Sequence, residues 1–184
     1  MKILLVTTDL NAFVRFRLDL ANSFKARGHE VHVCLDLDPK AKLYQEMMAC
    51  GLHLHHMPVH RTGLNPLKDI KGILALVRTI RQVRPDMLFS FLAKAVLYGN
   101  PLARLMGVKQ IYSLLPGLGV MFSDPKDGGR PWLQALARRP YLWSLGMCKK
   151  VFVQNPDDKM TIVGHGPWLD PRLHVIRSSG VNLN

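Results

Sequence analysis

Basic side chains stand at places where an apolar, strand-like run gives way to a helical pattern. Arg15 and Arg17 lie in "DLNAFVRFR" (residues 9–17), and Lys94 lies in "FLAKAVLYGN" (91–100). The free backbone N–H groups and the dipole at the start of a helix favour an anion, and a guanidinium can hold phosphate with two parallel hydrogen bonds. The three side chains are therefore candidate phosphate ligands, with ordinary solvated cations as the alternative interpretation.

A glycine pair follows a later apolar run. Gly117 and Gly119 stand two residues apart in "LLPGLGVMFSD" (114–124). Glycine permits a positive φ and lets a ligand approach bare backbone, although a plain turn would explain the same pattern. No G-x-G-x-x-G follows the first apolar run, so a dinucleotide site of the standard kind is disfavoured.

Histidines gather in "LHLHHMPVH" (52–60). In a strand, His53 and His55 would point to one face and His56 to the other, which disfavours a shared metal ion and favours packed or rim histidines. The cysteines are far apart and match no metal-ligand spacing, which predicts neither a disulfide framework nor a metal site and is typical of a reducing cytoplasm. They are Cys34, Cys50 and Cys148.

Short apolar runs alternate with longer helical patterns along the chain. Strands are expected at 2–8, 30–36, 52–58, 86–91, 109–115 and 149–155, and helices at 15–28, 39–51, 65–85, 95–107, 130–148 and 156–166. Such alternation predicts parallel pairing through right-handed crossovers. The expected fold is a Rossmann-like, doubly wound parallel α/β sheet with helices on both faces. Its ligands would bind outside the carboxyl ends of the strands, where the winding reverses.

Length and charge restrict the function further. A chain of 184 residues fits one domain, and its formal charge of +12 calls for an anionic partner. Nucleic acid, phospholipid headgroups and a phosphorylated small molecule all qualify. No stretch reaches the roughly 18 apolar residues of a spanning helix, so any membrane contact would be peripheral.

Several motifs in order resemble one family. "FVRFR" (13–17), "LAKAVLYGNPLARLMGVKQIYSLLPGLGVMFSD" (92–124), "KKVFVQNPDDKMTIV" (149–163) and "HVIRSSGVNLN" (174–184) are similar to the N-terminal half of a family-four glycosyltransferase of the GT-B architecture. The likeness is greatest to bacterial enzymes that add sugars to polyprenyl-pyrophosphate carriers. It implies retaining transfer of a hexosyl or N-acetylhexosaminyl group from a nucleotide-sugar, UDP-linked by expectation, to a lipid-linked saccharide in cell-surface glycan synthesis.

The resemblance also implies site residues. Together with the arginines above, the acceptor and phosphate ligands would come from K-x-x-x-Y-G, GLG and F-x-N-x-D-D motifs: Lys94, Tyr98, Gly117, Leu118, Gly119 and Asn155. Ala93 stands where some relatives carry a histidine, so no catalytic acid or base is assigned, and no metal is expected.

The end of the chain matches the family's interdomain linker. The resemblance divides the sequence into an acceptor-binding domain, 1–175, and the start of a linker, 176–184, toward a C-terminal domain that would hold the nucleotide-sugar. No other cofactor is implied. By itself the chain is expected to be inactive.

Aromatic and basic residues alternate in "RPWLQALARRPYLW" (130–143). Arg130, Trp132, Arg138 and Arg139 would suit an anionic membrane surface, and the protein would then be cytoplasmic and peripheral on the inner face of the cytoplasmic membrane. A solvated helix with core tryptophans is the alternative. Two other functions remain open: a basic α/β module that binds nucleic acid, although no RNA- or DNA-binding signature supports it, and a scaffold that recruits a separate catalytic subunit to the membrane.

Overall fold

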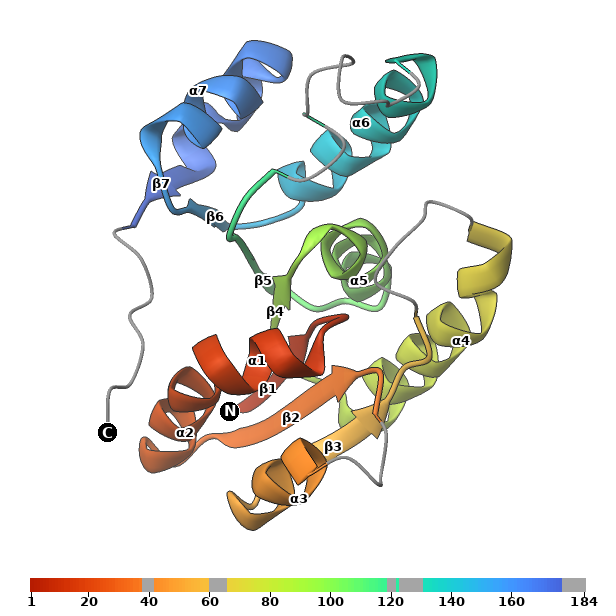
Figure 1. The fold of residues 1–184 in the computed structure, drawn as a ribbon, viewed down its shortest axis with the longest axis vertical. Helices are drawn as coiled ribbons and strands as arrows, with labels where there is room; N and C mark the ends of the chain where they lie inside the picture. Colours follow the sequence, from red (N-terminus) through yellow and green to blue (C-terminus); the bar gives the residue numbers. More distant parts are fainter. Residues whose placement is uncertain (38–41, 60–65, 119–121, 123–130, 177–184) are drawn as a thin grey trace.

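The computed structural model describes residues 1–37, 42–59, 66–118, 122 and 131–176, with the backbone alone for 66–68 and 131–135. Within these ranges the chain forms a single parallel sheet that has helices on both faces (Figure 1). The predicted Rossmann-like, doubly wound α/β fold is therefore confirmed.

The sheet holds seven strands in the order β3-β2-β1-β4-β5-β6-β7. Six of them lie where the sequence predicts them: β1 (Lys2–Val6), β2 (Glu30–Leu35), β3 (His53–His56), β4 (Met87–Phe91), β5 (Gln110–Leu115) and β6 (Lys150–Val153). The seventh, β7 (Leu173–Val175), extends one edge beside β6. It was not among the six expected strands, because three residues are too few to show an alternation.

The helices connect successive strands and cover the two faces. They are α1 (Leu10–Phe16), α2 (Leu18–Ala26), α3 (Lys42–Ala49), α4 (Pro66–Val83), α5 (Ala93–Leu105), α6 (Pro131–Gly146), α7 (Pro156–His165) and a 3₁₀ helix, η3 (Pro167–Arg172). Among these described elements, none has both the length and the apolar character needed to cross a bilayer.

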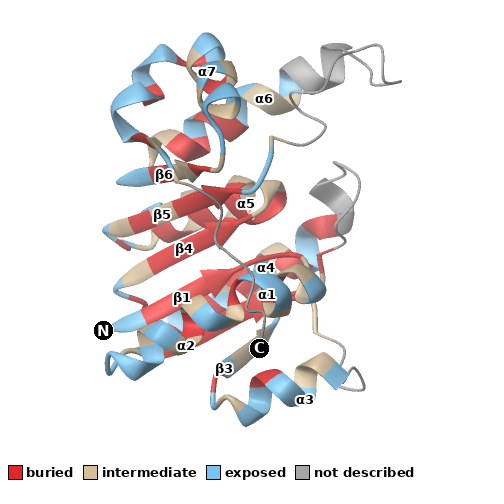
Figure 2. Ribbon diagram, turned by 60° about the vertical axis from the view of Figure 1, so that its left-hand side comes forward, coloured by how far each residue is buried: buried red, intermediate tan, exposed pale blue. Residues whose placement is uncertain are grey.

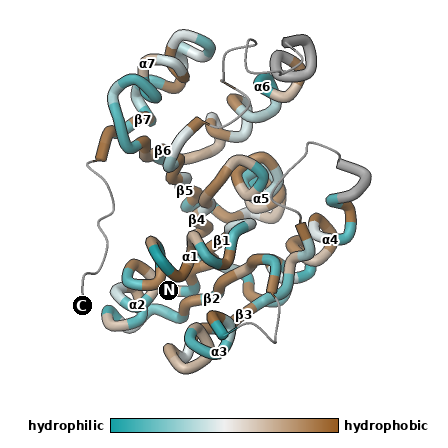
Figure 3. The backbone as a smooth tube through the Cα atoms, viewed as in Figure 1, coloured by the Kyte–Doolittle hydropathy of each residue, from teal (hydrophilic) through white to brown (hydrophobic). Residues whose placement is uncertain are grey.

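Two hydrophobic cores lie on opposite faces of the sheet. Leu4 and Val6 of β1 pack with α4, α5 and α6, whereas Ile3 and Leu5 pack with α1, α2 and α3. The strands are therefore apolar on both faces, which explains their continuous rather than alternating hydrophobic sequence. Figure 2 shows β1 and β4 almost wholly buried, and Figure 3 shows hydrophobic stretches in the central strands beneath more polar helices.

The first predicted helix, 15–28, contains α2 but only the last two residues of α1, because the helical segment begins earlier than expected, at Leu10. Asp9 begins α1 by accepting a hydrogen bond from the Ala12 N–H at 2.9 Å. The chain then breaks at Arg17, whose φ of −130° and ψ of −12° both end α1 and begin α2. Helical spacing of apolar residues continues across the break, so the sequence alone did not reveal it. Gly28 ends the helical segment with a φ of +79°, as the sequence predicts.

A buried polar cluster joins β4, β5, α5 and α6. The side chain of Asn100, in α5, accepts a hydrogen bond from Ser90 at 2.9 Å and donates to Ser113 at 2.9 Å. Its amide also lies 3.1 Å from Cys148 Sγ, and Ser144 donates to the Val96 carbonyl from the same region of α6. Because every member has a partner, the cluster fixes the positions of two strands and two helices relative to one another.

Candidate functional site

The winding of the sheet reverses between β1 and β4. From β1 the chain moves outward to β2 and β3, and β4 then returns to the other side of β1, followed by β5, β6 and β7. The loops that leave β1 and β4 diverge, so a crevice forms between them at the carboxyl edge of the sheet. In folds of this kind, ligands bind in this crevice.

A pocket of about 170 Å³ lies at this reversal, and we call it the switch-point pocket. Its lining comes from the end of β4, the loops after β1, β4 and β5, helix α1 and the junction between α1 and α2: Thr7, Ala12, Phe13, Phe16, Arg17, Phe91, Leu92 and Pro116. Most of these side chains are apolar and one is a cation. Such a lining suits a ligand that has both an apolar part and a negative charge.

Arg17 supplies the positive charge of the switch-point pocket. The side chain is only 6% exposed. Its Nη1 donates to the Phe16 carbonyl at 2.8 Å, and its guanidinium carbon lies 5.4 Å from the centre of the Phe91 ring. Burial lowers the pKa of Arg17, but an arginine stays protonated at neutral pH. The charge is thus held in a fixed position against an aromatic face.

Leu92 has a strained backbone at the same place. It joins β4 to α5 with φ 72° and ψ 158°, a conformation that ordinarily belongs to glycine. A residue in that region costs on the order of 1–3 kcal/mol, and such residues cluster at functional sites. Nothing in the sequence around Leu92 indicates this conformation. Phe91 and Leu92 are therefore pocket residues that sequence reasoning missed.

Arg15 and the glycine motif lie at the carboxyl edge but do not line the pocket. Arg15 is exposed in the last turn of α1. Gly117 is exposed, its φ is not positive, and a Cβ built on it would meet nothing within 4 Å. The positive φ that glycine would permit is therefore not used at Gly117, and the chain leaves β5 in a conformation open to any residue, as the plain-turn alternative has it. Leu118 packs against the core beneath α5 and α6, and Gly119 lies outside the described residues.

Lys94 and Tyr98 have a protein partner. Lys94 is 6% exposed, and its Nζ lies 3.0 and 2.8 Å from the two carboxylate oxygens of Asp69, which is 1% exposed. Tyr98 donates to the same carboxylate at 2.9 Å, and burial together with that bond raises the pKa of Tyr98. This triad ties the first turn of α4 to the first two turns of α5. Structural pairing accounts for both side chains without a phosphate ligand.

Asn155 serves as the N-cap of α7. Its Oδ1 accepts from the Asp158 N–H at 2.7 Å, and its Nδ2 donates to the Asp158 carboxylate at 3.0 Å. It follows β6, which lies two strands beyond β4 in the sheet, or roughly 10 Å away. Asn155 therefore has a structural role at the start of α7.

The residues predicted to face a membrane lie on or before α6. Arg138 is half-buried, with its guanidinium carbon 5.2 Å from the centre of the Phe122 ring and its Nη1 3.2 Å from His165 Nε2. Arg139 is exposed and lines a different pocket, between α6, α7 and η3. Arg130 and the side chain of Trp132 lie outside the described residues.

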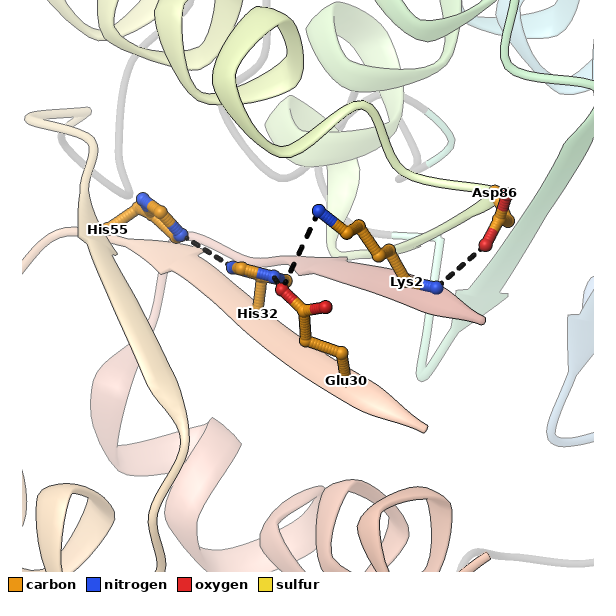
Figure 4. A network of polar contacts seen from close by, with 5 residues as sticks. All are labelled: Lys2, Glu30, His32, His55 and Asp86. Carbon is orange, nitrogen blue, oxygen red and sulfur yellow. Dashed lines mark hydrogen bonds and ion pairs between the residues drawn. The ribbon is translucent and has the colours of Figure 1, made fainter. Parts of the chain in front are cut away.

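The histidines form a cluster with β2 at the edge of the sheet. His32 Nδ1 lies 2.9 Å from His55 Nε2, and His32 Nε2 lies 2.8 Å from a Glu30 carboxylate oxygen (Figure 4). The His53 ring stacks on His32 with centroids 4.8 Å apart. No group of side chains in the described part of the chain has the arrangement of a metal site. The cluster consists of packed and rim histidines, as the alternation in sequence favours.

This cluster predicts a loss of stability in mild acid. The pKa values of His32 and His55 lie below the ordinary histidine value of 6.5, chiefly because the two rings are partly buried. Between that value and the lower folded-state pKa, the unfolded chain binds more protons, so the free energy of unfolding falls as pH decreases. Urea denaturation at pH 7.5 and 5.5 should show this fall, and His55→Asn should reduce it. An equal fall in the variant would assign the effect to other groups, such as His165, whose pKa burial also lowers.

Sequence and structure comparisons agree with this geometry. The chain matches the family described as "Glycosyl transferase 4-like domain" over residues 14–178. It belongs to this family. No curated protein gives a significant sequence match.

Solved structures share the fold. MurG of Acinetobacter baumannii is 14% identical with a TM-score of 0.60, and the match covers 99% of this chain and 46% of MurG. UDP-GlcNAc 2-epimerase of Neisseria meningitidis, bound to UDP-GlcNAc, is 13% identical with a TM-score of 0.68, covering 97% of this chain and 47% of that one. The lipopolysaccharide outer core galactosyltransferase WaaB, in its apo form, is 14% identical with a TM-score of 0.61, covering 96% and 45%. This family member thus spans about half the length of each, and its fold fits the N-terminal domain of a GT-B protein.

Proposed function

We propose that this domain binds the acceptor in a retaining glycosyltransferase that moves a hexosyl or N-acetylhexosaminyl group from a UDP-sugar to a lipid-linked saccharide during cell-surface glycan synthesis. The switch-point pocket is the observation that supports it most. A pyrophosphate joined to an isoprenoid chain has one strongly anionic and one apolar part, and the pocket combines the buried guanidinium of Arg17 with the rings of Phe13, Phe16 and Phe91.

The donor would bind outside the described residues. The chain covers 46% of MurG and 47% of an epimerase whose structure contains UDP-GlcNAc. In the proposal, residues 1–175 form the acceptor domain, residues 176–184 begin a linker, and a second domain holds the UDP-sugar. The isolated chain would then bind acceptor but not transfer sugar.

In this proposal the domain contributes position and charge rather than a proton-transfer group. Arg17 would fix the acceptor pyrophosphate, so that the acceptor hydroxyl faces the opening of the crevice where the donor domain closes. Transfer with retention would proceed by front-side attack, with the leaving phosphate assisting deprotonation. Such chemistry depends on orientation and on stabilisation of developing charge. A lipid-linked acceptor also requires peripheral contact with the cytoplasmic face of a membrane.

Removing the charge of Arg17 should weaken acceptor binding. Farnesyl-pyrophosphate-linked N-acetylglucosamine is a short, soluble probe for the acceptor. We expect calorimetry to show that the chain binds it, and that Arg17→Gln weakens binding by about 2 kcal/mol, the usual worth of a hydrogen bond to a charged group. Arg17→Lys should be intermediate, because lysine keeps the charge but not the planar fork.

Arg27→Gln is the matched control, since Arg27 is exposed at the end of α2 and does not line the pocket. This variant should bind the probe like the wild type. Circular dichroism establishes that each variant is folded. Equal weakening by both variants would show a diffuse charge effect instead of a site. Tight UDP-sugar binding by the isolated chain would contradict the assignment to the acceptor side, and strong, steeply salt-dependent RNA binding would favour a nucleic-acid module.

A further inference from the structure

A second pocket lies at the opposite edge of the sheet. Its volume is about 550 Å³, and its lining comes from the ends of α6 and α7 and from η3: Arg139, Leu142, Trp143, Gly146, Met147, His165 and Trp168. We call it the α6–η3 pocket. Because α6 leads into β6 and η3 leads into β7, it lies at the amino edge of the strands. The switch-point pocket lies at the carboxyl edge, so the two sites are separate.

Two indole rings border the α6–η3 pocket and are open to solvent. Trp143 is 60% exposed and Trp168 is 62% exposed. The Trp168 ring lies against glycine backbone: a Cβ added to Gly166 would be 3.3 Å from its Cζ2, and one added to Gly146 would be 3.9 Å from its Nε1. Packing thus fixes this ring with most of its surface uncovered. Exposed apolar rings that carry an N–H group are typical of contact with a membrane–water interface.

Further exposed apolar side chains lie on the same two helices, α6 and α7. Leu136 and Trp143 stand seven residues apart on one face of α6, and Leu136 is 64% exposed. On α7, Met160 is 71% exposed. Lys149 and Lys150, both exposed, lie where the chain passes from α6 into β6. The corner formed by α6, α7 and η3 therefore presents apolar groups next to cations, a combination found in interfacial helices.

The described residues of this corner carry more cations than carboxylates. The cations are Arg138, Arg139, Lys149, Lys150, Lys159 and Arg172, and the carboxylates are Asp157, Asp158 and Asp170. Arg139 lines the pocket and is exposed, and α6 contains no acidic residue. The carboxylate of η3, on Asp170, is paired with Lys159 at 2.9 Å. Burial and the nearby Arg138 lower the pKa of His165, so the pocket's charge at neutral pH comes from Arg139. An anionic ligand is complementary to this arrangement.

The side chains that line the pocket distinguish between anionic ligands. A saccharide or a nucleobase presents several hydroxyl or amide donors, which carboxylate or amide side chains usually accept. Among the described residues that line the pocket, none is Asp, Glu, Asn or Gln. Apolar walls with a single guanidinium instead match a phosphate ester that continues into hydrocarbon.

We infer that the α6–η3 pocket holds the headgroup of an anionic phospholipid, with Arg139 on the phosphate and the indoles of Trp143 and Trp168 at the boundary of the acyl chains. The inference rests on the proposed function in placing the domain at a membrane, and it names the lipid and the residues that hold it there.

Flotation with vesicles tests the inference. One set is phosphatidylcholine alone and the other contains about one third phosphatidylglycerol. We expect the chain to bind the second set. Arg139→Gln should weaken binding about fivefold, the effect of one cation at an anionic surface. The double variant Trp143→Ser, Trp168→Ser should weaken it by more than about tenfold, because two apolar side chains no longer leave water.

Two matched controls remove the same groups elsewhere. Arg78→Gln removes an exposed cation from α4, and Leu105→Ser removes a side chain that is 81% exposed on α5. Both should bind like the wild type. Equal losses of binding in the controls and the pocket variants would overturn the inference, as would absence of binding to either set of vesicles. Two further results would also overturn it: a dimer in light scattering that the tryptophan variants abolish, and competition by inorganic phosphate as strong as that by dihexanoyl-phosphatidylglycerol. These vesicles contain no acceptor, so their result is independent of the soluble acceptor probe used for Arg17.

Discussion

Asp69→Asn is expected to lower the free energy of unfolding by about 3–5 kcal/mol, because it leaves the buried ammonium of Lys94 without a counter-charge. The two side chains are 1% and 6% exposed and lie 2.8 Å apart. Tyr98 loses a charged acceptor at the same time. Urea denaturation followed by circular dichroism measures the change, which should appear in the midpoint with little change in slope.

A double variant tests whether the loss of stability comes from the unpaired charge of Lys94. Asp69→Leu with Lys94→Met removes both charges and keeps similar volumes, so it should recover most of the lost stability. Glu46→Gln changes an exposed carboxylate of α3 in the same chemical way and should alter stability by less than about 0.5 kcal/mol. A cost below about 1 kcal/mol for Asp69→Asn would mean that water reaches the pair in solution.

The pair also changes the interpretation of the K-x-x-x-Y-G motif. Lys94 and Tyr98 lie four residues apart on α5, so both reach one carboxylate of α4. In this structure the motif aligns two helices beside the switch point, and the cation at the crevice comes from Arg17. An effect of Lys94 on sugar transfer would then be indirect, through the position of α5.

The fold could be predicted because its signal is local and repeated. Each central strand is a short run that is apolar on both faces, and each is followed by a segment with helical spacing. Six strands and their parallel pairing could therefore be predicted without any information on which strands are neighbours. β7 escaped because three residues carry no period. The break at Arg17 escaped because Phe13, Phe16 and Leu20 continue a helical spacing across it.

The site was predicted less completely because it depends on contacts between distant residues. Arg17, Lys94 and Gly117 each follow a predicted strand, so the sequence correctly placed them toward the carboxyl edge of the sheet. It could not reveal that Asp69, 25 residues before Lys94, neutralises the lysine. The positive φ of Leu92 likewise arises from tertiary packing and not from residue type. Side-chain partners, in contrast to the strands and helices themselves, leave no periodic pattern in one sequence.

Asn100→Ala should cost about 3 kcal/mol, since it removes the amide that bonds the buried hydroxyls of Ser90 and Ser113, and losing a buried hydrogen-bond partner costs about 1–3 kcal/mol. The two hydroxyls would keep their bond to each other, at 2.7 Å. Asn100 and both serines are fully buried, so water cannot replace the lost bonds. Asn11→Ala, at an exposed position of α1, is the control and should change stability by less than about 0.5 kcal/mol.

The same variant has a second readout in Cys148. Burial raises the pKa of this thiol to about 12, and Asn100 and Ser113 contact its sulfur at 3.1 and 3.2 Å. A thiol in this state reacts slowly, because the thiolate is the nucleophile. Loosening α5 from α6 in Asn100→Ala should expose Cys148 and speed its reaction with a thiol reagent under native conditions, measured against Cys50→Ser as background. Unchanged reactivity together with unchanged stability would mean that the amide does not hold the two helices to β4 and β5.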